Sequence, residues 1–188
     1  MEKEFITPEQ LLKDAYLLAL NIYRSEFHPT FLAGVWRGGA PIAIAVHELL
    51  DFLGIKCGHL PIKISSYDGL NERSKNIVVQ GMTEFCQSVN TKDRVLIVDD
   101  VHDTGLSLDH LLTTFKSVFK ASVPEIRIAT TYFKPKNNRT NNVPDFYVRK
   151  VDNWLVFPHE LQGLSIDELE KNKPELSDIL LYLKNLQP

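Results

Sequence analysis

Hydrophobic and polar positions along the chain predict strands and helices in alternation. Short apolar runs bounded by turn residues predict buried strands, and apolar residues at every third or fourth position predict helices between them. The predicted strands are residues 30–36, 59–64, 95–98 and 126–133, followed by two short ones at 146–148 and 154–157. The predicted helices are residues 9–25, 40–53 and 107–120, with Thr7 as the N-cap of the first and a helical tail from residue 164.

Two segments and part of the tail break this alternation. Residues 65–80 are polar and predict a loop or a mobile hairpin, and residues 134–144 predict a polar connection. In the tail, Ser165 and Glu168 have the spacing of a capping box, and Pro174 interrupts the helical pattern.

The order of the elements predicts an α/β fold, with a mainly parallel twisted sheet flanked by helices. A length of 188 residues suits one domain. In sheets of this kind ligands bind beyond the carboxyl ends of the strands. We therefore expect the functional residues where the predicted strands end.

Composition narrows the classes of function. A net charge of −3 argues against a nucleic-acid partner, because such proteins carry a basic face. Cys57 and Cys86 are too few and too far apart for a disulfide framework or a zinc site. The amino-terminal residues contain no apolar signal core, and no apolar run approaches a membrane span. We expect a cytoplasmic protein with no membrane partner.

The stretch VLIVDDVHDTGLSL, residues 95–108, carries the strongest chemical signal. A predicted strand runs into Asp99 and Asp100, and Asp103 precedes a predicted helix start. Ionised carboxylates accept hydrogen bonds from sugar hydroxyls or hold the waters of a divalent cation. Backbone N–H groups and hydroxyls at the helix start can hold a phosphate, and they belong to Asp103, Thr104, Gly105, Leu106 and Ser107. A ribose 5-phosphate would fit both groups of residues, because it carries sugar hydroxyls and a phosphate.

Two other kinds of site can contain such a stretch. A Walker-type nucleotide loop is disfavoured because the G-x-x-x-x-G-K-[ST] pattern does not occur. An acid pocket of the receiver or phosphatase type would use the aspartates but has no need of the Thr-Gly-x-Ser that follows. Acids after a strand and an Asp at a helix N-cap are also common without any function.

The stretch resembles the motif that binds phosphoribosyl pyrophosphate (PRPP) in type I phosphoribosyltransferases. Two further segments resemble that family in the expected order. Val35-Trp-Arg-Gly-Gly is similar to its pyrophosphate loop, in which Arg37, Gly38 and Gly39 would meet pyrophosphate, and a cis peptide bond would fall before Arg37. Ser66 and Tyr67 resemble the Ser-Tyr pair of the flexible hood loop, here about residues 64–82, which closes over the site and excludes water.

Residues 133–161 resemble the base-binding segment of bacterial xanthine–guanine phosphoribosyltransferases. The resemblance implies that Lys134 donates to the 6-oxo group of a purine, that Trp154 stacks on the purine, and that the Leu155 backbone bonds its edge. Relatives place a magnesium-contacting Asp after this segment. Here Glu160 is the nearest acid, and His159 is a candidate contact for pyrophosphate.

The resemblance implies a magnesium-dependent transfer of 5-phosphoribosyl from PRPP to a 6-oxopurine (hypoxanthine, guanine or xanthine). Asp99 and Asp100 would hold the ribose hydroxyls and, with Glu160, the metal, partly through water, and Asp103 would be the general base. The phosphoribosyltransferase domain would cover residues 1–163, with a helical tail at 164–188. Family relatives are homodimers or homotetramers. The alternative is a regulatory protein of the same fold that binds PRPP without catalysis.

Overall fold

The computed structural model describes residues 3–68, 75–120 and 122–184, apart from the side chains of residues 66–68, 75–77 and 183. The chain forms two compact units. The larger is Leu12–Asp152, and the smaller combines Met1–Leu11 with Asn153–Pro188. The predicted boundary at residue 163 was based on a resemblance and stays a prediction.

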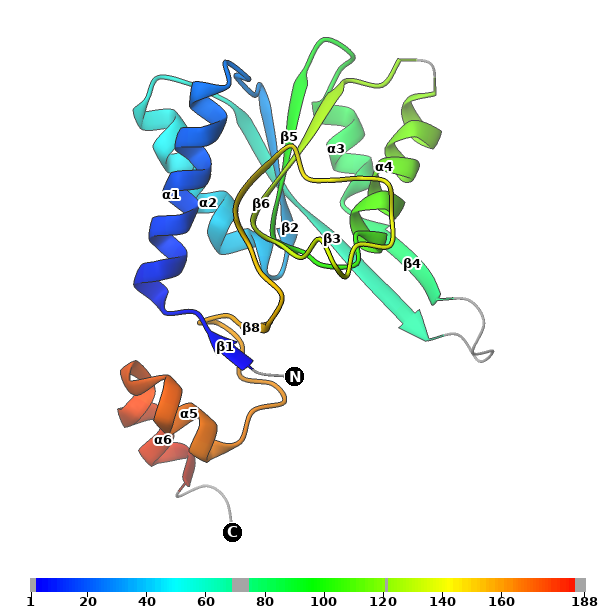
Figure 1. Ribbon diagram of the computed structural model, residues 1–188. Helices are drawn as coiled ribbons and strands as arrows, with labels where there is room; N and C mark the ends of the chain where they lie inside the picture. Colours follow the sequence, from blue (N-terminus) through cyan, green and yellow to red (C-terminus); the bar gives the residue numbers. More distant parts are fainter. Residues whose placement is uncertain (1–2, 69–74, 121, 185–188) are drawn as a thin grey trace. The chain divides into compact units, whose positions relative to one another are not determined.

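A six-stranded sheet is the centre of the larger unit (Figure 1), with the strand order β4-β3-β2-β5-β6-β7. Every neighbouring pair is parallel except β3 and β4, which form an antiparallel hairpin. The strands are β2 (Phe31–Trp36), β3 (Gly58–Asp68), β4 (Lys75–Gln80), β5 (Arg94–His102), β6 (Glu125–Phe133) and β7 (Phe146–Lys150). The mainly parallel α/β class predicted from the sequence is confirmed.

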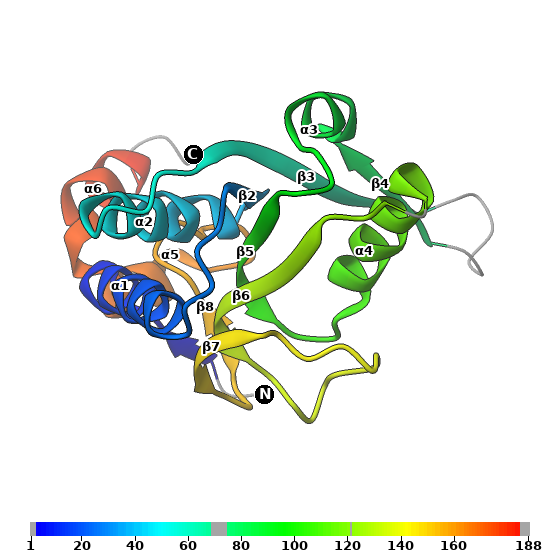
Figure 2. The ribbon, with the colours of Figure 1, turned by 90° about the horizontal axis from the view of Figure 1, so that it is seen from above.

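Helices cover both faces of this sheet. Figure 2 shows α1 and α2 on one face and α3 and α4 on the other. The helices are α1 (Pro8–Arg24), α2 (Gly39–Phe52), α3 (Met82–Ser88) and α4 (Leu106–Phe119). The Thr7 hydroxyl accepts from the Gln10 N–H at 3.1 Å, as its predicted N-cap role requires. None of the described helices is long and apolar enough to cross a membrane.

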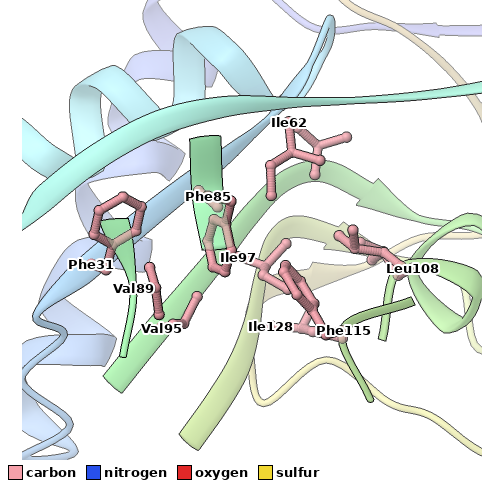
Figure 3. Packing of buried hydrophobic residues seen from close by; sticks show 12 residues of the cluster. Phe31, Ile62, Phe85, Val89, Val95, Ile97, Leu108, Phe115 and Ile128 are labelled. Atoms are coloured by element: carbon pink, nitrogen blue, oxygen red, sulfur yellow. The ribbon is translucent and has the colours of Figure 1, made fainter. Parts of the chain in front are cut away.

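The core on the α3 and α4 face follows the period of two of the strands. Alternate residues of β2 and β5 point into it, among them Phe31, Val95 and Ile97, and they meet Phe85 of α3 and Phe115 of α4 (Figure 3). The intervening positions, such as Leu96 and Val98, are also buried. Burial on both faces explains why β5 is a continuous apolar run in the sequence.

Two predicted boundaries were wrong. The strand predicted at 95–98 continues to His102, because β5 stays paired with β6 from Arg94 opposite Glu125 to His102 opposite Phe133. The acids Asp99 and Asp100 therefore lie within the strand and not after it. The second is the end of the strand predicted at residues 59–64, which continues to Asp68 because β3 stays paired with β4 as far as Asp68 opposite Lys75. The hairpin, one of the two forms expected for residues 65–80, is confirmed, whereas α3 after it was not predicted.

The smaller unit contains a two-stranded parallel ribbon of β1 (Lys3–Phe5) and β8 (Trp154–Val156). It also contains α5 (Ile166–Asn172), a 3₁₀ turn at Pro174–Leu176 and α6 (Ser177–Lys184). Ser165 and Glu168 form the predicted capping box at the start of α5, and the 3₁₀ turn starts at Pro174, where the helical pattern is interrupted.

Candidate active site

Two adjacent carboxylates lie near the carboxyl end of β5, at the edge of the sheet where a ligand is expected. The Asp99 carboxylate accepts from the backbone N–H of Asp100 at 3.0 Å, and the Asp100 carboxylate accepts from that of Val101 at 2.7 Å. The Thr131 hydroxyl of β6 donates to the Asp100 carbonyl at 2.6 Å. Hydrogen bonds from the backbone and from the neighbouring strand thus hold this stretch in place.

The electrostatics of this pair favour a ligand that brings positive charge or donors. Burial raises the pKa of the Asp99 carboxyl well above its ordinary value, and the negative charge of Asp100 raises it further, while the Asp100 backbone N–H opposes the shift. A divalent cation or a pair of sugar hydroxyls would relieve this repulsion.

The loop between β2 and α2 packs against these acids. It contains Arg37, which is exposed, and the peptide bond between Trp36 and Arg37 is cis, as the resemblance implies. A Cβ on Gly38 would lie 1.7 Å from the Asp100 carboxylate oxygen Oδ2, and one on Gly39 would lie 2.5 Å from the Val98 carbonyl oxygen. Only glycine fits at both positions, so the Arg-Gly-Gly segment predicted from the sequence is in contact with the acid pair.

The predicted phosphate-binding turn lies between β5 and α4. Gly105 has a φ of 77° and is the N-cap residue of α4, so the free N–H groups of the first helical turn follow it. A Cβ here would lie 2.6 Å from Thr140 Oγ1, 2.7 Å from His102 Nε2 and 2.9 Å from Asn138 Oδ1. Glycine is required both by the left-handed backbone and by this close packing.

Asp103 is held by two side chains from the segment after β6. The Lys134 ammonium lies 3.2 Å from one carboxylate oxygen, and the Asn137 amide donates to the other at 2.9 Å. Lys134 is only 4% exposed. The structure therefore brings together Asp103 and Lys134, which were predicted to act on the base, and adds Asn137, which sequence reasoning missed.

The polar segment 134–144 forms the wall behind the phosphate-binding turn, and this role was not predicted. The Arg139 N–H donates to the Thr104 carbonyl at 2.9 Å. The Asn142 amide donates to Asp109 of α4 at 2.5 Å, and the Asn138 amide donates to the Asn142 carbonyl at 2.9 Å. The run Asn-Asn-Arg-Thr-Asn-Asn was the available signal, because such side chains commonly bond nearby backbone groups.

His102 is buried behind the same turn. Among the described residues neither of its ring nitrogens has a hydrogen-bond partner. Burial lowers the pKa of His102, and the nearby Asn138 side chain, the Asn142 backbone and the charge of Asp103 oppose the shift. The neutral imidazole therefore fills space between the β5 end and the segment after β6.

The remaining predicted residues belong to the smaller unit or to the β3–β4 hairpin. Trp154, 57% exposed, and the buried Leu155 are on β8 of the smaller unit. The Glu160 carboxylate, a predicted metal ligand, accepts from the Phe157 N–H at 3.0 Å, and the His159 ring stacks on that of Phe157. Ser66 and Tyr67 lie on β3 within the hairpin, their side chains are outside the described residues, and so is the hairpin end at 69–74.

Protein side chains alone do not make a closed metal site in the described ranges, which contain no group of three or more His, Cys, Asp or Glu placed to hold a metal ion. Magnesium does not require one, because it is commonly bound through one or two carboxylates, with water and substrate phosphates completing its shell. The adjacent oxygen donors of Asp99 and Asp100 have the chemistry for that kind of site.

The α/β fold, with acids and a glycine loop meeting at the carboxyl edge of the sheet, is of the type I phosphoribosyltransferase class. A family profile described as a phosphoribosyl transferase domain matches residues 5–168. The chain belongs to this family.

Individual relatives agree. A xanthine-guanine phosphoribosyltransferase of Desulfotalea psychrophila is 27% identical over 84% of this chain and 86% of its own length. A hypoxanthine-guanine phosphoribosyltransferase of Bacillus subtilis is 26% identical over 93% of this chain and 91% of its own. The crystal structure of a purine phosphoribosyltransferase from Pyrococcus horikoshii matches with a TM-score of 0.68 and 31% identity, over 88% of this chain and 99% of that one.

Proposed function

We propose that this protein transfers 5-phosphoribosyl from PRPP to a 6-oxopurine, releasing pyrophosphate and a nucleoside 5′-monophosphate. The observation that carries the proposal is the contact between the Arg37-Gly38-Gly39 loop and the Asp100 carboxylate of β5. The phosphate-binding turn follows directly after the end of the same strand. One end of PRPP carries pyrophosphate, the middle carries two hydroxyls, and the other end carries a phosphate. The relatives named for guanine, xanthine and hypoxanthine support a 6-oxopurine as acceptor.

Binding of PRPP would use three groups of residues. Arg37 and the backbone N–H groups of Gly38 and Gly39 would bind pyrophosphate. Asp99 and Asp100 would accept from the ribose hydroxyls. The amides and hydroxyls from Asp103 to Ser107 at the start of α4 would hold the 5′-phosphate.

In the transfer step the bond between C1 and pyrophosphate breaks as a purine nitrogen bonds to C1. Positive charge develops on the ribose, and the carboxylates of Asp99 and Asp100 would stabilise it, while Arg37 would stabilise the leaving pyrophosphate. Asp103 would accept the proton that the purine loses. An ionised carboxylate has about four acceptor sites, so its bonds to Lys134 and Asn137 leave room for that proton.

Magnesium would be held by Asp99 and Asp100, partly through water, together with substrate oxygens. When bound, it would neutralise the negative charge that develops on the leaving pyrophosphate. For the base, Lys134 would donate to the 6-oxo group, Trp154 would stack on the ring, and the Leu155 backbone would bond its edge. We further propose a role in purine salvage, a cytoplasmic location and a homodimer or homotetramer.

The test is pyrophosphate release with PRPP and magnesium, measured in parallel with hypoxanthine, guanine, xanthine, adenine and orotate. We expect release with one or more 6-oxopurines and its loss in Asp103→Asn, since the amide cannot take the proton. PRPP binding by calorimetry without release for any base would instead support the regulatory alternative. Absence of PRPP binding would reject both.

A further inference from the structure

Lys173, directly after α5, is a buried lysine, and no carboxylate of the described residues is in hydrogen-bonding contact with it. Its residue is only 2% exposed. Its ammonium donates to the backbone carbonyl oxygens of Phe157 at 2.6 Å, Pro158 at 2.9 Å and Glu160 at 2.9 Å. An ammonium has three donors, so each one is satisfied by a carbonyl. Burial lowers the pKa of Lys173, and the charges of Glu175 and Glu160 oppose that shift.

These three carbonyls belong to one turn, which follows β8 directly. Within the turn the Glu160 N–H donates to the Phe157 carbonyl at 3.0 Å, and the Glu160 carboxylate accepts from the Phe157 N–H, also at 3.0 Å. The negative ends of three carbonyl dipoles meet at one point, where they repel one another unless a cation lies between them. The conformation of the turn therefore depends on the Lys173 ammonium.

Another lysine of the tail, Lys184, is in a different environment. Lys184 pairs with Glu170 at 2.6 Å, with both side chains about half exposed. Such pairs contribute little to stability. A buried ammonium is costly to place unless all its donors are bonded. A lysine on the surface would form a stabilising contact without this desolvation cost. The burial of Lys173 therefore indicates that its role is to hold the turn.

We propose that Lys173 is a positioning residue for the purine: through one ammonium, the C-terminal tail fixes the turn that follows the base-binding residues Trp154 and Leu155. This inference rests on the proposed function. Phe157 adjoins the end of β8, so displacement of its carbonyl changes the path of the backbone after Leu155. Apart from His159 and Glu160, whose side chains contact Phe157 within the turn, the residues assigned to PRPP lie in the larger unit, between residues 12 and 152. We therefore expect the loss of Lys173 to affect purine binding more than PRPP binding.

The first experiment measures steady-state kinetics of the full-length chain, with Lys173→Met removing the charge at similar length. We expect the KM for the purine to rise about tenfold or more, with the Kd for PRPP from calorimetry changed by less than about twofold. Lys184→Met is the matched control and leaves both constants at the wild-type values. An unchanged purine KM in Lys173→Met overturns the proposal, and so does an equal loss of purine and PRPP affinity.

Two conservative variants keep the test decisive if Lys173→Met does not fold. Lys173→Arg keeps the charge, and Lys173→Gln keeps donors without charge. We expect the purine KM to rise from wild type to Lys173→Arg and again to Lys173→Gln, because only a positive charge at this position holds the three carbonyls together. Equal purine KM values in all three proteins overturn the proposal.

Hydrogen exchange separates this proposal from the proposed function. We expect the amides of Phe157, His159 and Glu160 to exchange faster in Lys173→Gln than in the wild type, whatever reaction the protein catalyses. If the wild type releases pyrophosphate with a purine but exchange and purine KM are the same in the variant, only the role of Lys173 fails. If the wild type releases none with any purine, the proposed function fails, and the positioning role fails with it.

Discussion

At the scale of single residues, the candidate site is built from side chains that hold one another. Asp103 is the clearest case, because its two carboxylate oxygens bond to different residues of the segment after β6. Lys134 was predicted from the resemblance of residues 133–161 to the base-binding segment of bacterial xanthine–guanine phosphoribosyltransferases. Asn137 was not, since an asparagine in a polar run has no periodicity that marks it.

We expect Asn137→Ala to lower kcat for purine transfer by about tenfold, because the lost bond is to a charged group, and such hydrogen bonds contribute about 1.5–3 kcal/mol. PRPP affinity should stay at the wild-type value. The measurement is steady-state pyrophosphate release, with the exposed Asn141→Ala as the matched control. Equal kcat in the two variants would show that Asp103 needs no support from Asn137.

At the scale of elements, contacts between neighbouring segments decide which residues are possible. The loop before α2 and the end of β5 come so close that a side chain on Gly38 or Gly39 fits only if atoms of β5 move. A new methyl group would meet different atoms at Gly38 and at Gly39. We therefore expect the two alanine variants to differ in stability and in PRPP binding.

Gly39→Ala places the new carbon 2.5 Å from the Val98 carbonyl oxygen and 2.8 Å from the Asp99 Cα, which are backbone atoms of a central strand. We expect a lower thermal midpoint together with loss of PRPP binding. Gly38→Ala meets the Asp100 carboxylate, which can turn away, so PRPP affinity should fall with a smaller change in midpoint. Calorimetry of PRPP binding and thermal unfolding check both, and identical behaviour of the two variants would contradict the assignment of contacts.

A second inter-element contact joins α1 to the sheet. Asp14 is fully buried, accepts from the Tyr132 hydroxyl at 2.8 Å and pairs with Arg149 at 3.0 Å. The Arg149 side chain is about half exposed, so removal of Asp14 leaves it solvated, but the buried Tyr132 hydroxyl loses its acceptor. We expect Asp14→Ala to lower the free energy of unfolding by about 1–3 kcal/mol in urea titrations, as for an unsatisfied buried polar group.

The matched control is Asp152→Ala, which removes the exposed pair with Lys136 at 2.6 Å. It should cost less than about 1 kcal/mol, as surface pairs do. A loss in Asp14→Ala as small as that of the control would mean that the tyrosine and arginine contacts do not hold the helix.

At the scale of the whole molecule, buried titratable groups couple stability to pH. His102 is buried and its pKa is lowered from 6.5, mainly by burial. The unfolded chain therefore binds a proton below about pH 6.5 that the folded protein does not, and stability rises with pH in this window.

We expect the urea midpoint of the wild type to decrease when the pH is lowered from 7.5 to 5.5, and to decrease more than that of His102→Gln. The variant lacks this proton uptake on unfolding. The exposed His28→Gln should keep the wild-type slope. Parallel pH profiles of the wild type and His102→Gln would mean that the buried imidazole protonates as readily in the folded state.

The sequence by itself determined the α/β class, the motif of acids and glycines, and most strands and helices. These follow from local rules: apolar period, capping residues and the requirement for small residues in tight loops. It placed the end of β5 four residues too early, because Asp99 and Asp100 are polar, whereas the backbone pairing with β6 that keeps them in the strand is indifferent to side-chain polarity.

Only the tertiary structure decided which distant residues meet. The support of Asp103 by Asn137 spans 34 positions, and the bond from Lys173 to the Phe157 carbonyl spans 16. Neither partner has a spacing that predicts the other, because a hydrogen bond across a fold depends on how the backbone brings two segments together. In the sequence Lys173 is an ordinary lysine of a polar tail, and its burial among three carbonyls makes it a candidate for function.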